Sequence, residues 1–266
     1  SLTLGAVLNG ELRYTRGPHS WITQLGVTHA WSKTPTVGPF IKTADEANLK
    51  SLYEYRFRKY KKVALYGGLQ LITPLAPGDL VAAQDTVLRL QNVDGSEILG
   101  QALADERTRL TKSFSPLIFK QLAGASARPY AQDLATLDVR MAIAGQEVWA
   151  SGYTLADDKA TPELELKELQ DYQQLGLQLE AELGGKIKKN LVYAFRVELM
   201  YPFVTSIDTD LSGFDLLNTD LSFKLGLKIS KWASLEYVFA AKRLPLIVNQ
   251  WQITNNLVFS LTANIL

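Results

Sequence analysis

The C-terminal segment alternates between two sets of residues, and this period-two pattern restricts the fold more than any other feature of the chain. Leu257, Phe259, Leu261, Ala263 and Ile265 alternate with Val258, Ser260, Thr262 and Asn264. Successive side chains of a β-strand point to opposite faces, so this period is typical of a strand with one apolar face. The segment therefore predicts a strand that ends the chain.

The same alternation recurs along most of the sequence. Apolar rows with this spacing occupy 2–12, 21–31, 49–57, 63–71, 119–127, 137–143, 175–183, 191–201, 221–229, 235–241 and 251–265. Many of these rows approach the roughly 9–11 residues that a tilted strand needs to cross a bilayer. The pattern predicts an all-β fold, a transmembrane antiparallel up-and-down β-barrel with about eleven strands visible in this chain.

The clearest row lies at 191–201. Its alternation predicts that Leu191, Tyr193, Phe195, Val197 and Leu199 face lipid. Arg196 and Glu198 then face the lumen, because a strand turns neighbouring residues to opposite sides.

The connections between these rows alternate in length. Short turns are predicted at 16–18, 59–61, 128–130, 184–186 and 230–232. Longer segments lie near 33–47, 73–115, 145–165 and 202–215, with a shorter one near 244–250. Outer-membrane barrels have short periplasmic turns and longer external loops. We therefore expect one barrel domain over 1–266, with a long external loop at 73–115.

The loop at 73–115 has internal structure of its own. Asn92-Val93-Asp94-Gly95 lies between two apolar stretches, and Asp-Gly is a strong hairpin signal. Residues 97–110 also fit a short amphipathic helix, and periodicity alone leaves both alternatives open.

Composition excludes several classes of protein. The chain is 47% hydrophobic and 21% charged with a mean hydropathy of −0.02, and no apolar run reaches the length of a spanning helix. A net charge of +1 gives no reason to expect nucleic acid as a partner. The absence of cysteine removes disulfides and thiolate zinc sites. No signal peptide begins at Ser1, so export requires a segment removed earlier.

Aromatic residues fall near the expected strand ends. Tyr14, Trp21, Phe57 and Trp232 lie by short turns, and Trp31, Tyr201 and Trp251 lie by longer loops. Rings at both ends fit the aromatic girdles of a barrel in the bacterial outer membrane. Its partners would then be membrane lipid, lipopolysaccharide and the outer-membrane insertion machinery. The alternative, core aromatics of a soluble sandwich, is disfavoured by the number and length of the strands.

The expected inward rows carry charges of both signs. The candidates for lining the lumen are Glu11, Arg13, Lys50, Glu54, Arg56, Lys120, Asp138, Arg140, Glu180, Glu182, Arg196, Glu198, Lys224, Lys228, Glu236 and Lys242. They fit either a lumen filled with ion pairs and water or a narrow polar channel. Mixed signs at adjacent levels favour mutual neutralisation over selective conduction of one ion type. The sequence therefore predicts little stable conductance.

Enzymatic chemistry has weak support, and we expect no catalytic residue, cofactor or metal. His19 lies in a short turn and His29 on the expected lipid face, and neither is placed for a Ser–His pair. Asp85, Asp94, Asp157 and Asp158 fit solvated loop charges or cation-mediated contacts to lipid headgroups. The pairs at 67–68 and 184–185 are turn or bulge glycines without the following helix of a phosphate loop.

Scattered motifs resemble an uncharacterised family of outer-membrane β-barrels from Gram-negative bacteria of myxobacteria-like lineages. They are residues 115–120, 128–129, 138–140, 157–158, 166–171, 193–199, 231–235 and 255–256. The resemblance covers most of the chain with diffuse motifs, and it implies a location and a fold but no catalytic residue. The sequence departs from such barrels at Leu266, where an aromatic residue is common.

Three roles remain open from the sequence. The first is a porin-like structural or narrow passive transport component. The second is a binding module in which loop 73–115 presents a surface to an envelope protein, and the third, least favoured, is an outer-membrane enzyme. Eleven strands would leave the first and last running the same way, whereas bacterial single-chain barrels use even numbers. The simplest resolution is a strand before Ser1, giving about twelve. The alternatives are a parallel closure between the first and last strands, or a miscounted strand near 202–215.

Overall fold

The computed structural model describes residues 2–261 apart from 34, 36, 37, 61, 133, 157–160 and 231. The structure is almost entirely β, with one 3-10 turn, η1 (Gly213–Leu216). No helix in the described part of the chain is long and apolar enough to cross a membrane. The final residues of the last predicted row, 262–266, lie outside the described residues.

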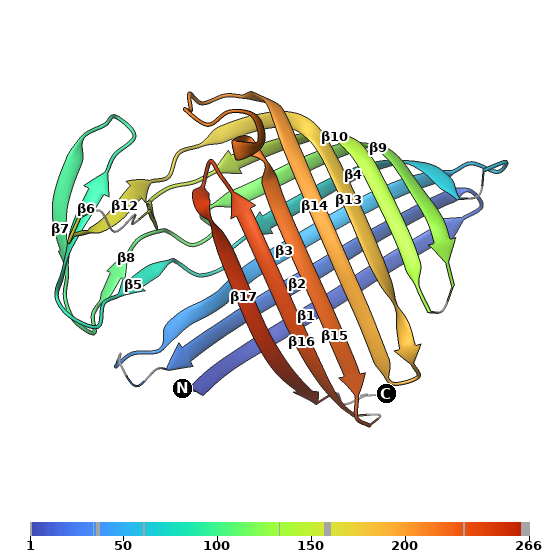
Figure 1. The fold of residues 1–266 in the computed structure, drawn as a ribbon, viewed down its shortest axis with the longest axis horizontal. Coiled ribbons are helices and arrows are strands. Elements are labelled where there is room, and N and C mark those ends of the chain that lie inside the picture. The colour runs from blue at the N-terminus through green and yellow to red at the C-terminus, as the bar shows by residue number, and fades with distance from the viewer. Residues whose placement is uncertain are drawn as a thin grey trace.

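Eleven strands form one antiparallel sheet in which almost every strand pairs with its neighbours in the chain (Figure 1). They are β1 (Leu2–Arg16), β2 (His19–Lys33), β3 (Ile41–Arg56), β4 (Val63–Thr73), β9 (Leu117–Ala131), β10 (Thr136–Trp149), β13 (Tyr172–Lys188), β14 (Leu191–Thr205), β15 (Asn218–Lys228), β16 (Ala233–Leu244) and β17 (Val248–Leu261). The expected all-β antiparallel fold and its count of eleven visible strands are confirmed.

The sheet curls so that β13–β17 cross in front of β1–β4, β9 and β10 (Figure 1). We call the side between these two halves the concave face and the other side the convex face. Strands β1 and β17 are the two edges of the sheet, and the described residues contain no pairing between them. They run in the same direction, as an odd number of antiparallel strands requires.

Burial alternates along the strands in the sense opposite to that of a soluble protein. On β13, Gln174, Gln178 and Glu180 are at most 3% exposed, whereas Leu177 and Leu179 are 43% and 44% exposed. The polar row therefore faces the concave side and the apolar row the convex side. Soluble proteins bury Leu and expose Gln and Glu far more often.

A second, smaller unit is built from two connections at one end of the sheet. Strands β11 (Tyr153–Leu155), β12 (Leu164–Glu168), β6 (Thr86–Gln91) and β7 (Glu97–Ala102) form a four-stranded sheet. Strands β5 (Asp79–Val81) and β8 (Arg107–Arg109) pair beside it. Leu88, Ala102 and Leu166 form its buried core. The connection at 73–115, for which the sequence predicts a long loop with internal structure, contains β5, β6, β7 and β8 and makes up most of this subdomain.

The alternative that periodicity left open inside this segment is resolved as a hairpin. Gly95 has a φ of +83°, and its N–H donates to the carbonyl of Asn92 at 3.0 Å. A positive φ is easily adopted by glycine, which is why Asp-Gly favours this turn. The Ser96 hydroxyl and N–H donate to Asp94, and these bonds lower the pKa of that carboxyl.

Two predicted turns are wrong, and in both places a strand continues. Arg128 and Pro129 lie within β9, opposite the single residue Asp138 of β10, so the proline occupies a β-bulge where its missing N–H is tolerated. Gly185 lies within β13 at a close backbone approach. A Cβ placed there would be 2.0 Å from the carbonyl oxygen of Leu134.

Candidate functional site

The concave face carries three tiers of side chains, which can be followed along β10. Its inward row consists of Val148 at the subdomain end, then Gln146, Ala144, Ala142 and Arg140. Val148 belongs to an apolar tier, Gln146 to a tier of carboxamides and Arg140 to a tier of ion pairs. Each tier is completed by residues from other strands.

The charged tier centres on Glu180, which is 2% exposed. Its carboxylate accepts hydrogen bonds from Lys50 at 3.0 Å, Arg196 at 3.0 Å and Arg140 at 3.3 Å. These cations come from three different strands, β3, β14 and β10. Burial of a carboxylate is tolerated only with such pairing, so Glu180 ties both halves of the sheet together.

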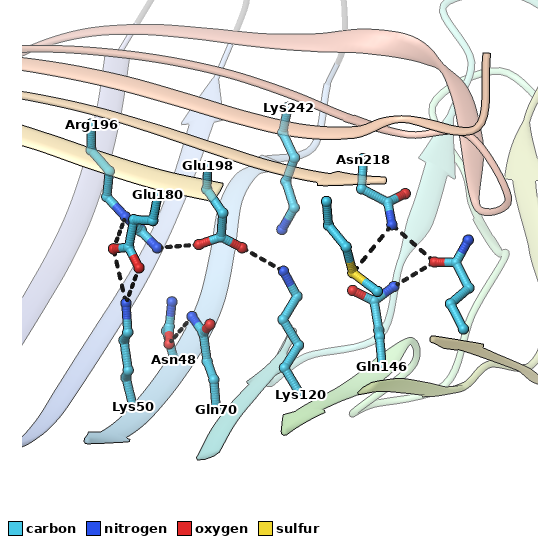
Figure 2. Close-up of polar contacts among 12 residues, drawn as sticks. Asn48, Lys50, Gln70, Lys120, Gln146, Glu180, Arg196, Glu198, Asn218 and Lys242 are labelled. Atoms are coloured by element: carbon cyan, nitrogen blue, oxygen red, sulfur yellow. Dashed lines mark hydrogen bonds and ion pairs between the residues drawn. The ribbon is translucent and has the colours of Figure 1, made fainter. Parts of the chain in front are cut away.

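A second ion pair crosses the concave space beside the first. Lys120 of β9 donates to Glu198 of β14 at 2.6 Å, and both residues are buried. Arg196 also donates to Glu198, so it links the two carboxylates (Figure 2). Further out, Arg56 and Arg140 contact Glu54, at 3.2 Å and 3.9 Å.

The amide tier lies between the charged tier and the subdomain. It consists of Asn48, Gln70, Gln146, Gln174, Gln178 and Asn218. Gln146 and Asn218 both donate to the Oε1 atom of Gln174, at 3.3 Å and 2.9 Å, and Gln70 donates to Asn48 (Figure 2). No separate sequence signal marks this tier, because uncharged amides in an alternating row resemble any other polar residues of a strand.

The apolar tier, which we call the collar, lies at the subdomain end of the concave face. It consists of Ile72, Ile118, Val148, Tyr172 and Leu244, which come from five strands and form one buried cluster. Above it lies a cavity of about 270 Å³ between the sheet and the subdomain. Ile72, Ile118 and Leu244 line this cavity as well.

The structure divides the charged residues that the sequence singled out. Lys50, Glu54, Lys120, Arg140, Glu180, Arg196 and Glu198 meet in the charged tier, and Lys242 contacts Glu46 at 3.6 Å. Asp138 pairs with Arg128 at 2.7 Å. Glu11, Arg13, Lys224, Lys228 and Glu236 are exposed, and the side chain of Glu182 is 48% exposed. Their role in lining a lumen stays a prediction.

The residues considered for chemistry have structural partners. His29 contacts Asp45 at 2.9 Å, and Asp45 also binds Lys42 and the N–H groups of Leu75 and Ala76. This cluster fastens the start of the subdomain to β3. Asp85 accepts from the N–H of Ala104.

The remaining candidates for chemistry are His19, at the start of β2, and the acid pair Asp157 and Asp158. His19 contacts the Tyr53 hydroxyl at 2.6 Å. Asp157 and Asp158 lie outside the described residues. Among the described residues, no three His, Asp or Glu side chains gather as a metal site would require.

Comparisons with known proteins give little beyond this geometry. No protein-family model matches the chain, and no curated protein matches it. Among solved structures, it is similar to the β domain of the Bordetella autotransporter Brka, with 10% sequence identity and a TM-score of 0.37. The match covers 97% of this chain and 87% of that one. A likeness of this size assigns neither a family nor a role.

Proposed function

We propose that this protein is an integral β-barrel-type protein of the bacterial outer membrane, with an interior closed by its own side chains. The observation that carries the proposal is the inverted burial on β13 and its neighbours. A convex face of exposed Leu, Ile and Phe is costly in water, and a bilayer removes that cost. A concave face of paired charges is what such a sheet would enclose.

The ends of β2 support this placement. Trp21 and Trp31 lie ten residues apart on the convex face and are 56% and 39% exposed. That spacing matches one bilayer crossing by a tilted strand, with an aromatic ring at each interface. The cluster of His29, Lys42 and Asp45 near Trp31 would then mark the end of the apolar band.

The role within that membrane is structural or narrowly passive. Lys120–Glu198 and the cations around Glu180 span the concave space, and the collar lies at one end of it. Neutralised charges and an apolar constriction both oppose the passage of ions. This proposal includes three expected partners, which are membrane lipid, lipopolysaccharide and the Gram-negative insertion machinery. It also includes the resemblance to a barrel family of myxobacteria-like lineages.

Cysteine labelling tests the membrane location, because the natural chain has no cysteine. Leu177→Cys lies on the convex face of β13, and Leu99→Cys lies on β7; the native residues are 43% and 67% exposed. In lipid vesicles, a water-soluble maleimide should label Leu99→Cys and spare Leu177→Cys, and denaturant should expose both. Equal labelling of both folded variants would refute membrane insertion.

Planar-bilayer recording tests the closed interior separately. Purified protein should give no large, steady single-channel current. Such a current would show that the charged tier leaves a path, without contradicting the labelling result.

The second candidate function is a binding module, and the ordered subdomain favours it. Ile98 and Leu99 of the edge strand β7 are 54% and 67% exposed. Edge strands with apolar side chains are suited to pairing with another chain. A photocrosslinker at Leu99 should then capture one discrete envelope protein in cells, and capture of none would remove this candidate.

A further inference from the structure

Several amide groups in the amide tier are buried without a hydrogen-bond partner among the described residues. The atoms are Oε1 of Gln70, Oε1 of Gln146, Nε2 of Gln174, both ends of Gln178 and Oδ1 of Asn218. Each of these side chains is 3% exposed or less. A buried amide has a donor end and an acceptor end, and each of these side chains leaves at least one end unpaired.

Three of these amides line one narrow cavity. Gln70, Gln146 and Asn218 surround it together with Met200. The cavity is small: it leaves a volume of about 10 Å³ that the centre of a water molecule can occupy. That is close to the minimum space for a single water molecule, and too little for any larger ligand.

The chemistry of the lining selects a neutral hydrogen-bond donor. The three orphaned atoms of the lining amides are oxygens, which accept hydrogen bonds. The cavity is also lined by two ammonium groups, of Lys120 and Lys242, and by two carboxylates, of Glu198 and Asp220. These charges balance, so the lining calls for neither a cation nor an anion. We propose that the cavity is a binding site for one water molecule, which donates to two of these amide oxygens.

The cavity adjoins the larger cavity above the collar. Ile72, Ile118, Lys242 and Leu244 line both this cavity and the 270 Å³ cavity above the collar. The inference rests on the packing of the concave face and does not depend on where the sheet resides.

Radical footprinting reports on this water because the chain has only two methionines. X-rays split water into hydroxyl radicals where the water lies, and a radical formed beside Met200 oxidises its sulfur. Met200 is 1% exposed, and its sulfur lies 3.8 Å from Nδ2 of Asn218. Met141, 54% exposed, lies on the convex face that lipid would cover, so free methionine in the same solution serves as the dose reference.

The test compares wild type with two leucine variants. Asn218→Leu removes an amide from the cavity, and Gln121→Leu removes an exposed amide from the convex face. We expect Met200 to be oxidised in wild type and, at the same rate, in Gln121→Leu. In Asn218→Leu we expect a rate at least about fivefold lower. The free methionine should be oxidised at the same rate in all three.

Two results would overturn the proposal. One is a Met200 that stays intact in wild type at doses that oxidise the free methionine, and the other is an unchanged Met200 rate in Asn218→Leu. If Asn218→Leu does not assemble, a high-resolution crystal structure of wild type decides. Density at hydrogen-bond distance from two of the amide oxygens supports the site, and an empty cavity contradicts it.

Discussion

Replacing Glu180 with glutamine tests whether the charged tier stabilises the sheet. Glu180 is 2% exposed and accepts from Lys50, Arg140 and Arg196 at 3.0–3.3 Å. Glutamine keeps the shape and loses the charge. Breaking a buried ion pair typically costs about 3–5 kcal/mol. Arg196 retains Glu198 and Arg140 retains Glu54, so we expect a loss near the lower limit, about 3 kcal/mol of unfolding free energy.

A matched control lies two residues further along the same strand. The Glu182 side chain is 48% exposed and 3.9 Å from Arg140, so Glu182→Gln should cost less than about 1 kcal/mol. Urea unfolding in lipid vesicles, followed by tryptophan fluorescence, measures both. Lys50 has no other carboxylate partner among the described residues, so adding Lys50→Met to Glu180→Gln should recover part of the loss. Equal stabilities of Glu180→Gln and Glu182→Gln, within about 0.5 kcal/mol, would refute the reasoning.

Three further substitutions test the register, a close backbone approach and the subdomain hairpin. Val197→Arg places a charge on the convex face between Arg196 and Glu198. It should lower the free energy of unfolding in vesicles by about 2–4 kcal/mol if the site is near the bilayer midplane. An unchanged urea midpoint would place this row away from lipid. Gly185→Ala puts a Cβ 2.0 Å from the Leu134 carbonyl oxygen, so it should lower the free energy of unfolding by about 1–3 kcal/mol. Gly10→Ala places its Cβ in open space and should lower it much less. Gly95→Val forces a β-branched residue to a φ of +83°, so limited proteolysis should cut the β6–β7 hairpin faster while the main sheet stays intact; an unchanged cleavage rate would contradict this.

The long strands could be predicted from sequence because period-two alternation persists wherever one face of a strand meets a different environment from the other. The predicted position of Arg196 and Glu198 on the face opposite Phe195 agrees with their burial in the ion-pair network. The turn predictions at Pro129 and Gly185 failed for a physical reason. Both residue types also occur inside strands, at a bulge and at a close backbone approach, and only the partner strand reveals which applies.

Two other features of the site lay beyond sequence reasoning. The contact between Lys120 and Glu198 joins strands that are not neighbours in the sheet, so no local pattern encodes it. The subdomain depends on a parallel pairing of β6 with β12, which come from connections on either side of β9 and β10. Short strands with mixed polarity gave only the Asp-Gly turn as a signal.

That parallel pairing also sets an order on folding. Leu88 and Leu166 meet in the subdomain core, yet the β9–β10 hairpin lies between them in the chain. The core therefore forms only after that hairpin has been made and both of its flanking connections have reached the same end of the sheet. Long-range contacts of this kind form late, because their loop-closure entropy is offset only when the intervening segment is already ordered. Protease resistance of the subdomain should consequently appear after that of the β9–β10 hairpin, and it would report that this hairpin is in place.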